Sequence, residues 1–453
     1  MTPFRWVAPA LLLLVAVMLP RCTPPVTPSA GNVLLLIADD LGIDYLAAYE
    51  IAPDAPATPH IDALAERGVL FRNAYAPPAC SASRAALLTG RYPFRYGFGT
   101  RLEAHRDTWE LPLSEYTLPE LLAQASARYA TGAVGKWHMS TFTSAHSLRH
   151  PLASGFDSHT GTLANLGVRD SRGERGSYNE WEKLSDGALT LSRTYATTAS
   201  VDDTLQRMSV LPAPWFLWVA FHAPHRPLHV PPQALSRHPI DKPADRFRAS
   251  IEALDAEIGR LLAQVPENTT VIFLSDNGTP GDFARPPFEV GHAKGTLYEG
   301  GVRTPLLIAG PAVRTPGARS DALVHVVDVF ATIAELAGAD LRALRDAAGA
   351  PVHIDGVSLL PVLREPATAK VRDFVFQGRS NQNGPGPRSR EEWMVRDSTH
   401  KLTRHCAGAS CEEALFRLVG VVEGPALPAD SSVSDTAARR RLRAELDRIL
   451  AGE

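Results

Sequence analysis

Three apolar runs that each end in polar side chains limit what this chain can fold into. They cover residues 32–40, 215–225 and 269–278 and read NVLLLIADD, WFLWVAFHAPH and TTVIFLSDNG. A continuous apolar run of this length is typical of a strand buried on both faces of a sheet. Strands of this kind need covering layers on both sides, so the chain is expected to bury a large sheet.

The segments between these strands have helical patterns. Two examples are TPHIDALAERG, with Thr58 as the expected helix cap, and DRFRASIEALDAEIGRLLAQV. Strands that alternate with helices predict an α/β fold, in which a large mixed and mostly parallel sheet is sandwiched by helices. We expect this α/β domain to cover residues 31–370.

The sequence changes character after about residue 370. Short β-like runs such as DFVFQGR, EEWMVRD and HKLTRHC are followed by the helical pattern DTAARRRLRAELDRIL. This order predicts a C-terminal α+β subdomain over residues 371–453, made of a small antiparallel sheet and a helix. The arginine run of that helix is expected to form a solvated face.

The N-terminus has the pattern of an export signal. Arg5 precedes a mostly apolar stretch over residues 7–19, which is short for a membrane span, and a Pro/Ser/Thr-rich tether follows. Residues 1–30 are therefore expected to direct the protein to the periplasm or outside the cell. Cys22 is a poor lipid acceptor because Arg21 precedes it, and an uncleaved anchor is the alternative, in which case this segment is the only membrane contact.

The chain has four cysteines, and one of them has no evident partner. Cys406 and Cys411 flank the turn CAGASC, which suits a local disulfide in an exported protein, and no spacing typical of a zinc site is present. Cys80 begins the stretch CSASRAALLTGR. Taken alone, it is open to four interpretations: a buried thiol, half of a disulfide, a thiolate nucleophile, or the precursor of a modified residue.

Hard oxygen ligands gather at the ends of two predicted strands. Asp39 and Asp40 end one, and Asp276 and Asn277 end another. Ligands of parallel sheets bind beyond the carboxyl ends of the strands, so these side chains point to one site. Carboxylate and amide oxygens suit Ca²⁺ or Mg²⁺ and not zinc or copper.

Basic and imidazole groups follow other predicted sheet ends and a Gly-rich loop. The net charge of −3 gives no overall basic field for nucleic acid, so anions must be bound by a local cluster. Beside a metal, such a cluster predicts a pocket for an oxyanion with general acid–base catalysis. The segments GKWH, FHAPHRPLH and GHAKGTLYEGGVR contribute Lys136, His138, His222, His225, His229, His292, Lys294 and Arg303.

The ordered motifs resemble the type I, formylglycine-dependent sulfatase family of the alkaline phosphatase superfamily. CSASRAALLTGR is similar to its Cys-x-Pro-Ser-Arg signature, and ADD, GKWH, APHRP, SDNG and KGTLYEGG follow in the family's order over about residues 32–310. Ala82 stands where the signature usually has proline, which puts the conversion of Cys80 in question. The resemblance implies an exported sulfatase that acts on an aryl or carbohydrate sulfate.

The resemblance also answers the question of Cys80. In this family the cysteine is oxidised by a formylglycine-generating enzyme to Cα-formylglycine, whose aldehyde hydrates to a gem-diol. A divalent cation is implied, calcium first and magnesium second. Its implied ligands are Asp39, Asp40, Asp276, Asn277 and the modified Cys80.

The same resemblance assigns a role to each remaining group. One gem-diol oxygen attacks sulfur while His225 protonates the leaving oxygen, and His138 then removes the second hydroxyl proton so that sulfate is expelled. Arg84 is implied to hold the gem-diol, and Lys136 and Lys294 the sulfate oxygens. A serine at position 80 would have no second hydroxyl for the last step.

Three other functions remain open from the sequence. A phosphonate monoester or phosphodiester hydrolase of the same superfamily would share the metal and the nucleophile. A relative that only binds sulfated glycans would keep Cys80 unmodified. A cysteine hydrolase with thiolate Cys80 and a histidine would leave the four oxygen ligands unexplained.

Overall fold

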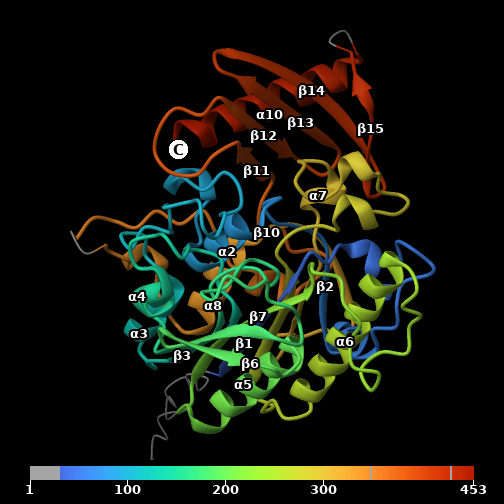
Figure 1. Cartoon of the computed structure of the whole chain (residues 1–453). Helices are drawn as coiled ribbons and strands as arrows, with labels where there is room; N and C mark the ends of the chain where they lie inside the picture. Colours follow the sequence, from blue (N-terminus) through green and yellow to red (C-terminus); the bar gives the residue numbers. More distant parts are fainter. Residues whose placement is uncertain (1–30, 347–348, 429–430, 453) are drawn as a thin grey trace, which may run out of the picture.

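The computed structural model describes residues 31–346, 349–428 and 431–452 (Figure 1). The predicted export segment and Cys22 lie outside these residues. No helix within the described ranges combines the length and apolar character that crossing a membrane requires.

The predicted large sheet is present and has ten strands. The central pairs β1 with β7, β1 with β8, and β3 with β7 are parallel, while β9 and the edge pairs β4–β5 and β5–β6 are antiparallel. The fold is thus mixed and mostly parallel at its centre. Across the sheet the order is β10 (Ala318–His325), β2 (Gly68–Tyr75), β9 (Leu306–Ala309), β8 (Thr269–Ser275), β1 (Asn32–Asp39), β7 (Trp215–Pro224), β3 (Ala130–Lys136), β4 (Ser158–Thr162), β5 (Trp181–Ser185) and β6 (Ala188–Ser192).

Helices cover both faces of this sheet, as its apolar strands require. Along β1, Val33, Leu35 and Ile37 face one core and the residues between them face the other. The first core contains α2 (Cys80–Thr89), α3 (Leu118–Gln124) and α8 (Val327–Leu336), and the second contains α1 (Pro59–Arg67), α5 (Ala196–Val210) and α6 (Pro243–Leu262) (Figure 1). Shorter helices are α4 (His150–Ala153), α7 (Glu299–Val302), α9 (Leu360–Arg364), η1 (Ile43–Tyr45), η2 (Ala47–Tyr49), η3 (Pro93–Tyr96), η4 (Ser147–Arg149), η5 (Gly281–Phe283), η6 (Val290–His292) and η7 (Leu341–Ala343).

The C-terminal part forms the predicted antiparallel sheet and helix, which lie at the top of Figure 1. Leu442, Leu446 and Ile449 of the helix are buried with Leu402 and Leu415 of the sheet. The expected disulfide between Cys406 and Cys411 joins two neighbouring strands. In order these elements are β11 (Val375–Ser380), β12 (Arg390–Arg396), β13 (His400–Ala407), β14 (Ser410–Val419), β15 (Val422–Leu427) and α10 (Val433–Ala451).

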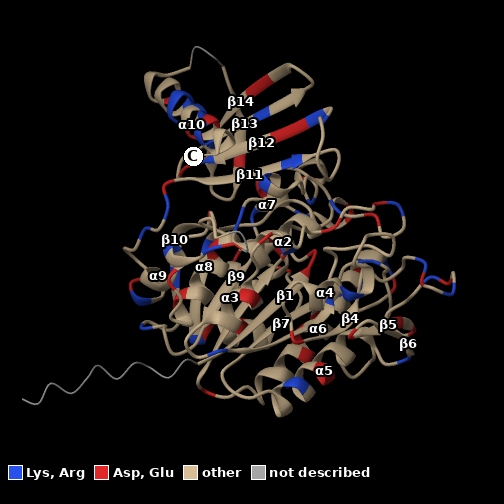
Figure 2. Cartoon of the chain, turned by 90° about the vertical axis from the view of Figure 1, so that its left-hand side faces the viewer, with Lys and Arg blue, Asp and Glu red and all other residues tan. Residues whose placement is uncertain are grey.

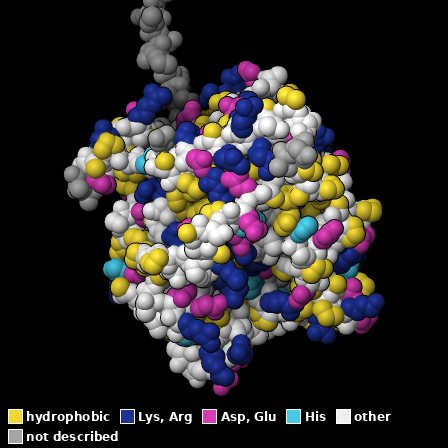
Figure 3. Space-filling view, turned by 90° about the horizontal axis from the view of Figure 1, so that it is seen from above, with side chains coloured by type: hydrophobic (Ala, Val, Ile, Leu, Met, Phe, Trp, Pro, Cys, Tyr) yellow, Lys and Arg dark blue, Asp and Glu magenta, His cyan; other side chains and the backbone are white. Residues whose placement is uncertain are grey.

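Charged side chains of both signs are mixed along the whole chain. Figure 2 shows Lys and Arg as well as Asp and Glu on the helices and in the C-terminal sheet, whereas the central strands of the large sheet carry few charges. The face seen from above likewise carries both signs among apolar side chains (Figure 3). On α10, Arg443 pairs with Glu413 and Arg441 with Asp397, and both arginine side chains are half exposed. The arginine run is therefore a solvated face that also pairs with the small sheet.

Thr58 occupies the N-cap position of α1, but its side chain does not cap the helix as predicted. Thr58 precedes the helix, but its hydroxyl contacts the Asp62 side chain instead of a free helix amide. The amides of His60 and Ile61 are bound instead by Asp255 of α6, at 3.1 and 2.8 Å. A tertiary contact has taken over the capping role that the local sequence suggested.

Glycine at position 135 lets β3 lie close to its neighbour. Gly135 has φ +89°, and a Cβ there would lie 2.0 Å from the carbonyl oxygen of Ala220. This backbone conformation and contact directly precede Lys136, which ends the strand. The residue is therefore required both for a left-handed conformation and for close packing.

We expect Gly135→Ala to lower the midpoint of thermal unfolding strongly, because it adds a steric clash to roughly 1–3 kcal/mol of backbone strain. Gly173→Ala is the matched control, since Gly173 has φ +81° but a Cβ there would meet no atom within 4 Å. The control should show the strain alone. Equal shifts of the two midpoints would contradict the packing role.

Candidate active site

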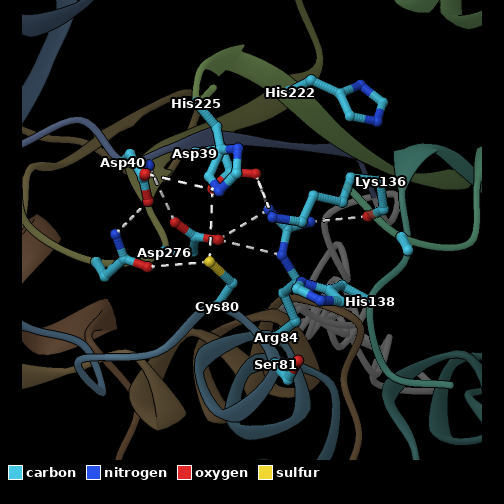
Figure 4. Close-up of polar contacts among 12 residues, drawn as sticks. Asp39, Asp40, Cys80, Ser81, Arg84, Lys136, His138, His222, His225 and Asp276 are labelled. Carbon is cyan, nitrogen blue, oxygen red and sulfur yellow. Dashed lines mark hydrogen bonds and ion pairs between the residues drawn. The ribbon is translucent and has the colours of Figure 1, made fainter. Parts of the chain in front are cut away.

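Neighbouring strands bring the predicted site residues to one edge of the large sheet. Strands β8, β1, β7 and β3 lie side by side in that order. Their carboxyl ends are followed by polar residues that converge in Figure 4. The groups so placed are Asp39, Asp40, Lys136, His138, His225, Asp276 and Asn277.

Cys80 is the first residue of α2 and points into this cluster. Its Sγ lies 3.3 Å from Oδ1 of Asn277, 3.6 Å from Oδ1 of Asp39 and 3.4 Å from Nζ of Lys294. The positive end of the helix dipole faces the same point and favours negative charge there. A small side chain at position 80 is thus held among oxygen ligands and a cation.

Ala82 does not disturb the start of α2. The first backbone hydrogen bond of the helix runs from the amide of Ser83 to the carbonyl of Ala79. The amide of Ala82 comes before this bond and belongs to the orphan donors of the first turn. Alanine and proline therefore both fit the helix at this position.

Two buried cations and the partly exposed Lys294 neutralise the carboxylates of the cluster. Arg84 donates to Asp276 at 2.9 and 3.2 Å and lies 3.5 Å from Asp39. Lys136 pairs with Asp39, and Lys294 pairs with Asp40. Burial favours a raised pKa for Asp39, but the charges of Lys136, His225 and Arg84 hold this pKa well below its usual range. Asp39 is thus kept ionised at the centre of the cluster.

The backbone of Asp40 and the side-chain amide of Asn277 orient the remaining oxygen atoms toward the cluster. Asp40 has φ +72°, and its amide donates to Oδ1 of Asp276 at 3.3 Å. The side-chain amide of Asn277 donates to Oδ1 of Asp40 at 2.8 Å, so its own oxygen is free to face Cys80. The predicted ligand residues are therefore brought together.

The donor set fits a hard divalent cation. Ligand atoms of Asp39, Asp40, Cys80 and His225 lie within 4.8 Å of one another, and the amide oxygen of Asn277 faces the same point. Carboxylate and amide oxygens are the preferred ligands of Ca²⁺ and Mg²⁺. His225 was not among the predicted ligands, and its Nε2 lies 3.8 Å from Asp40.

The two histidines differ in exposure and in the nitrogen that each leaves free. His138 is buried, and its Nε2 donates to the carbonyl of Leu102 at 3.1 Å, which leaves Nδ1 without a partner among the described residues. His225 donates through Nδ1 to its neighbour's carbonyl at 2.6 Å, so Nε2 faces Asp40. Burial and the charges of Lys136 and Arg84 lower the pKa of His138 well below its usual value.

Other basic groups from the same motifs lie outside the cluster. His222 bonds to Thr162 at 2.7 Å, and His229 bonds to Tyr195 at 2.8 Å. The His292 ring stacks on Tyr298 with 3.6 Å between centroids, and Arg303 bonds to the carbonyl of Arg72. These four side chains bond or stack with residues outside the cluster. Each of these two motifs therefore contributes one side chain to the cluster, His225 in the first and Lys294 in the second.

The thiolate interpretation of Cys80 conflicts with its surroundings. The residue is 1% exposed, and burial together with the charge of Asp276 raises its pKa to about 12. The thiol is therefore protonated near neutral pH and a weak nucleophile. Of the four interpretations, a buried thiol and the precursor of a modified residue both fit these surroundings.

Among the described residues, the cluster reaches solvent at His225 and Lys294. The side chains of Arg84 and Lys136 are fully buried, whereas those of His225 and Lys294 are 18% and 19% exposed. A ligand must therefore reach Cys80 past His225 and Lys294. Its reacting end would then lie against the buried cations.

Sequence reasoning missed the groups that support the cluster. The Ser81 hydroxyl accepts from the amide of Leu102, and Tyr178 donates to the carbonyl of His225 at 2.8 Å. Main-chain contacts such as those of Leu102 have no side-chain signature. Ser81 lies inside the CSASRAALLTGR stretch, but nothing local distinguishes it from a solvated serine.

Comparisons with known proteins agree with this geometry. The chain matches the sequence profile of the family described as Sulfatase over residues 31–339. It is 34% identical to the N-acetylgalactosamine-6-sulfatase of Homo sapiens over 384 residues, which cover 78% of this chain and 69% of that protein. The identity to the protein of the same name from Canis lupus familiaris is 33% over 369 residues, covering 74% and 66%.

Solved structures show the same overall arrangement. The crystal structure of Ps i-CgsB in complex with k-i-k-neocarrahexaose has a TM-score of 0.74 and 25% identity, and 92% of each chain is covered. The likeness therefore includes the C-terminal sheet and helix, beyond the range of the family profile.

We expect Asp40→Asn to weaken Ca²⁺ binding by roughly 10–100-fold, because a charged ligand is lost while its shape is kept. Isothermal titration calorimetry with CaCl₂ measures this directly. Asp44→Asn is the control, since Asp44 is also buried but bonds to Thr279 and lies outside the cluster. Unchanged affinity in Asp40→Asn, or a site that prefers Zn²⁺, would contradict the ligand assignment.

Proposed function

The chain belongs to the sulfatase family and is a sulfuric ester hydrolase, and we propose that it is exported and removes sulfate from a carbohydrate. The finer proposal is that it uses Cα-formylglycine made from Cys80 together with a divalent cation, Ca²⁺ before Mg²⁺. The observation that carries it is the meeting of Cys80 with three carboxylates and three cations at the start of α2.

Modification gives residue 80 a reactivity that its thiol lacks. A buried thiol whose pKa is about 12 offers little nucleophile near neutral pH. The hydrated aldehyde would supply two hydroxyls, one to attack sulfur and one to let sulfate leave. Asn277, Asp39 and Lys294, which contact the thiol, would then surround these hydroxyls.

The charge of the site suits a sulfate ester. Without an ion, three carboxylates and three cations cancel. A divalent cation held by Asp39, Asp40, Asp276 and Asn277 would leave the site positive by two charges and would supply Lewis acidity to the sulfuryl oxygens. Lys136 and Lys294 would hold the oxygens of the sulfate, and Arg84 would hold residue 80.

His225 and His138 would move protons at opposite ends of the reaction. His225 lies on the solvent side, where the leaving alcohol must be, so its Nε2 would protonate the departing oxygen. His138 is buried beside Arg84 and has an unpartnered Nδ1, which would take the proton whose removal lets sulfate leave (Figure 4). The proton given to the departing oxygen thus has a named donor, and the proton of the second hydroxyl has a named acceptor.

Two observations support a carbohydrate substrate and an exported protein. The two sequence relatives described above are named for a 6-sulfated amino sugar, and a structural relative was solved in complex with an oligosaccharide. The disulfide between Cys406 and Cys411 supports an oxidising compartment. A formylglycine-generating enzyme would be the partner during maturation.

The test of this function is a panel of esters given to purified protein with Ca²⁺. We expect sulfate release from sulfated monosaccharides such as N-acetylgalactosamine 6-sulfate, and from 4-nitrophenyl sulfate as an aryl probe. Phosphonate monoesters and phosphodiesters should react much more slowly. Faster turnover of a phosphodiester would favour the related hydrolase, and binding of sulfated sugars without turnover would favour a non-catalytic protein.

We expect the tryptic peptide that follows Arg72 and ends at Arg84 to be roughly 18 Da lighter in active protein than its cysteine form, since an aldehyde replaces CH₂–SH. Mass spectrometry measures the conversion. Cys80→Ser should lose steady-state turnover by at least roughly 10³-fold, because a sulfated serine cannot expel its sulfate. Full activity with an unmodified Cys80 would overturn the formylglycine proposal.

A further inference from the structure

The segment Gly97–Leu102 connects the C-terminal subdomain to the buried histidine of the active site. At its end, the amide of Leu102 donates to the hydroxyl of Ser81 at 2.9 Å, and the carbonyl of Leu102 accepts from Nε2 of His138 at 3.1 Å. Ser81 directly follows Cys80. Through its main chain, Leu102 therefore contacts both the residue that follows Cys80 and the buried His138.

The Leu102 carbonyl decides which nitrogen of His138 can act as a base. A carbonyl accepts only from a protonated nitrogen, so this bond places the proton on Nε2 and the lone pair on Nδ1. The described residues give His138 no other side-chain hydrogen bond, and its backbone is in the left-handed region with φ +61°. The ring's orientation thus depends on where Leu102 lies.

Asn383 holds the other end of this segment. Its Oδ1 accepts from the amides of Gly99 and Thr100, both at 3.0 Å, and its Nδ2 donates to the carbonyl of Arg101 at 3.2 Å. One side chain therefore makes three hydrogen bonds to consecutive residues just before Leu102. Asn383 itself lies in the loop between β11 and β12.

The surrounding loop fits closely against the same segment. The amide of Ser380 donates to the carbonyl of Gly99 at 2.9 Å, and the amide of Gly384 donates to the carbonyl of Gly97 at 2.8 Å. A Cβ on Gly99 would lie 1.7 Å from Oγ of Ser380, so no side chain fits between the two loops. The position of residues 97–101 is thus set by the C-terminal subdomain.

We propose that Asn383 is a positioning residue for the hydrolysis, acting through Leu102 on His138, and this rests on the role proposed above for His138. The C-terminal subdomain then contributes to catalysis without touching the reacting atoms. The effect falls on the release of sulfate, which follows departure of the alcohol. Loss of the three bonds lets Leu102 shift, and displacement of a base by about 1 Å can cost up to ~10²-fold in rate.

The test compares three variants in the full-length, Ca²⁺-loaded enzyme. Asn383→Ala removes all three bonds, and Asn383→Asp keeps the acceptor for Gly99 and Thr100 but loses the donor to Arg101. Asn381→Ala is the control, because among the described residues the Asn381 side chain bonds to Ser389 and Arg390 of its own hairpin and not to residues 97–102. Formylglycine content by mass spectrometry and the unfolding midpoint are measured for each protein.

The kinetic readout separates positioning from folding and from substrate binding. With 4-nitrophenyl sulfate and N-acetylgalactosamine 6-sulfate, Asn383→Ala should lower kcat and KM together, roughly 10–100-fold, and leave kcat/KM within about threefold, because the slowed step follows departure of the alcohol. Nitrophenol should appear in a burst of one equivalent per modified site, since only the later step is slowed. Asn383→Asp should lose less and Asn381→Ala nothing.

The outcomes are distinct for the two proposals. Wild-type protein that turns over no sulfate ester would refute the proposed function, and this inference with it. An active wild type with unchanged kcat in Asn383→Ala, or with a change in KM alone, would refute the inference while the function stands. If Asn383→Ala does not fold, an Asn383→Asp enzyme of normal unfolding midpoint and unchanged kcat would also refute it.

Discussion

The site depends on the mutual neutralisation of buried charges around Asp39. Its carboxylate lies at the end of the central strand β1, between Lys136 and Arg84, and all three side chains are fully buried. Removing one partner from such a group leaves an uncompensated buried charge, which costs about 3–5 kcal/mol. The strand ends and α2 must therefore come together for these charges to be paired. Because Cys80 and Arg84 both lie on α2, the ion pair of Arg84 with Asp276 also fixes the position of Cys80.

The order of strands gives this charge cluster its geometry. Because β8, β1, β7 and β3 are adjacent, residues separated by more than 200 positions, such as Asp40 and Asp276, become neighbours. Close contacts between paired strands, such as that of Gly135 in β3 with Ala220 in β7, let the strand ends approach each other. The helix dipole of α2 then adds positive potential at the point where the strands converge. An anion-binding site follows from the topology together with a few buried cations.

The sequence predicts the strands and motifs well because each is encoded by residues that lie close together in the chain. Apolar runs that end in acids define β1 and β8, and Cys80, Arg84 and Lys294 belong to recognisable motifs. What it does not contain is the pairing between distant segments. Asp255 replaces Thr58 at a helix start, and Asn383 lies in a loop that reads only as a Gly/Pro-rich connection. Main-chain hydrogen-bond partners such as Leu102 cannot be identified from residue type, because every residue other than proline carries the same amide and carbonyl.

The C-terminal subdomain contacts segments next to both Lys294 and His138, which makes it part of the frame of the site. On the side of Lys294, Glu299 of α7 is fully buried and bonds to Tyr75 at 2.6 Å and to Lys401 of β13 at 3.2 Å. Burial favours a raised pKa for Glu299, but Lys401, Arg396 and Arg303 lower this pKa to about 2, so the carboxylate stays charged.

On the opposite side, Asn383 holds the segment that reaches His138 through Leu102. Lys294 and His138, for which we propose roles in sulfate binding and proton transfer, are thus flanked by separate contacts to one subdomain. Because Glu299 is held by buried charges and Asn383 by neutral hydrogen bonds, the first contact is costly to break and the second is cheaper to move. Loss of a partner therefore costs more free energy at Glu299 than at Asn383, and the contact that reaches His138 through Leu102 is the weaker of the two.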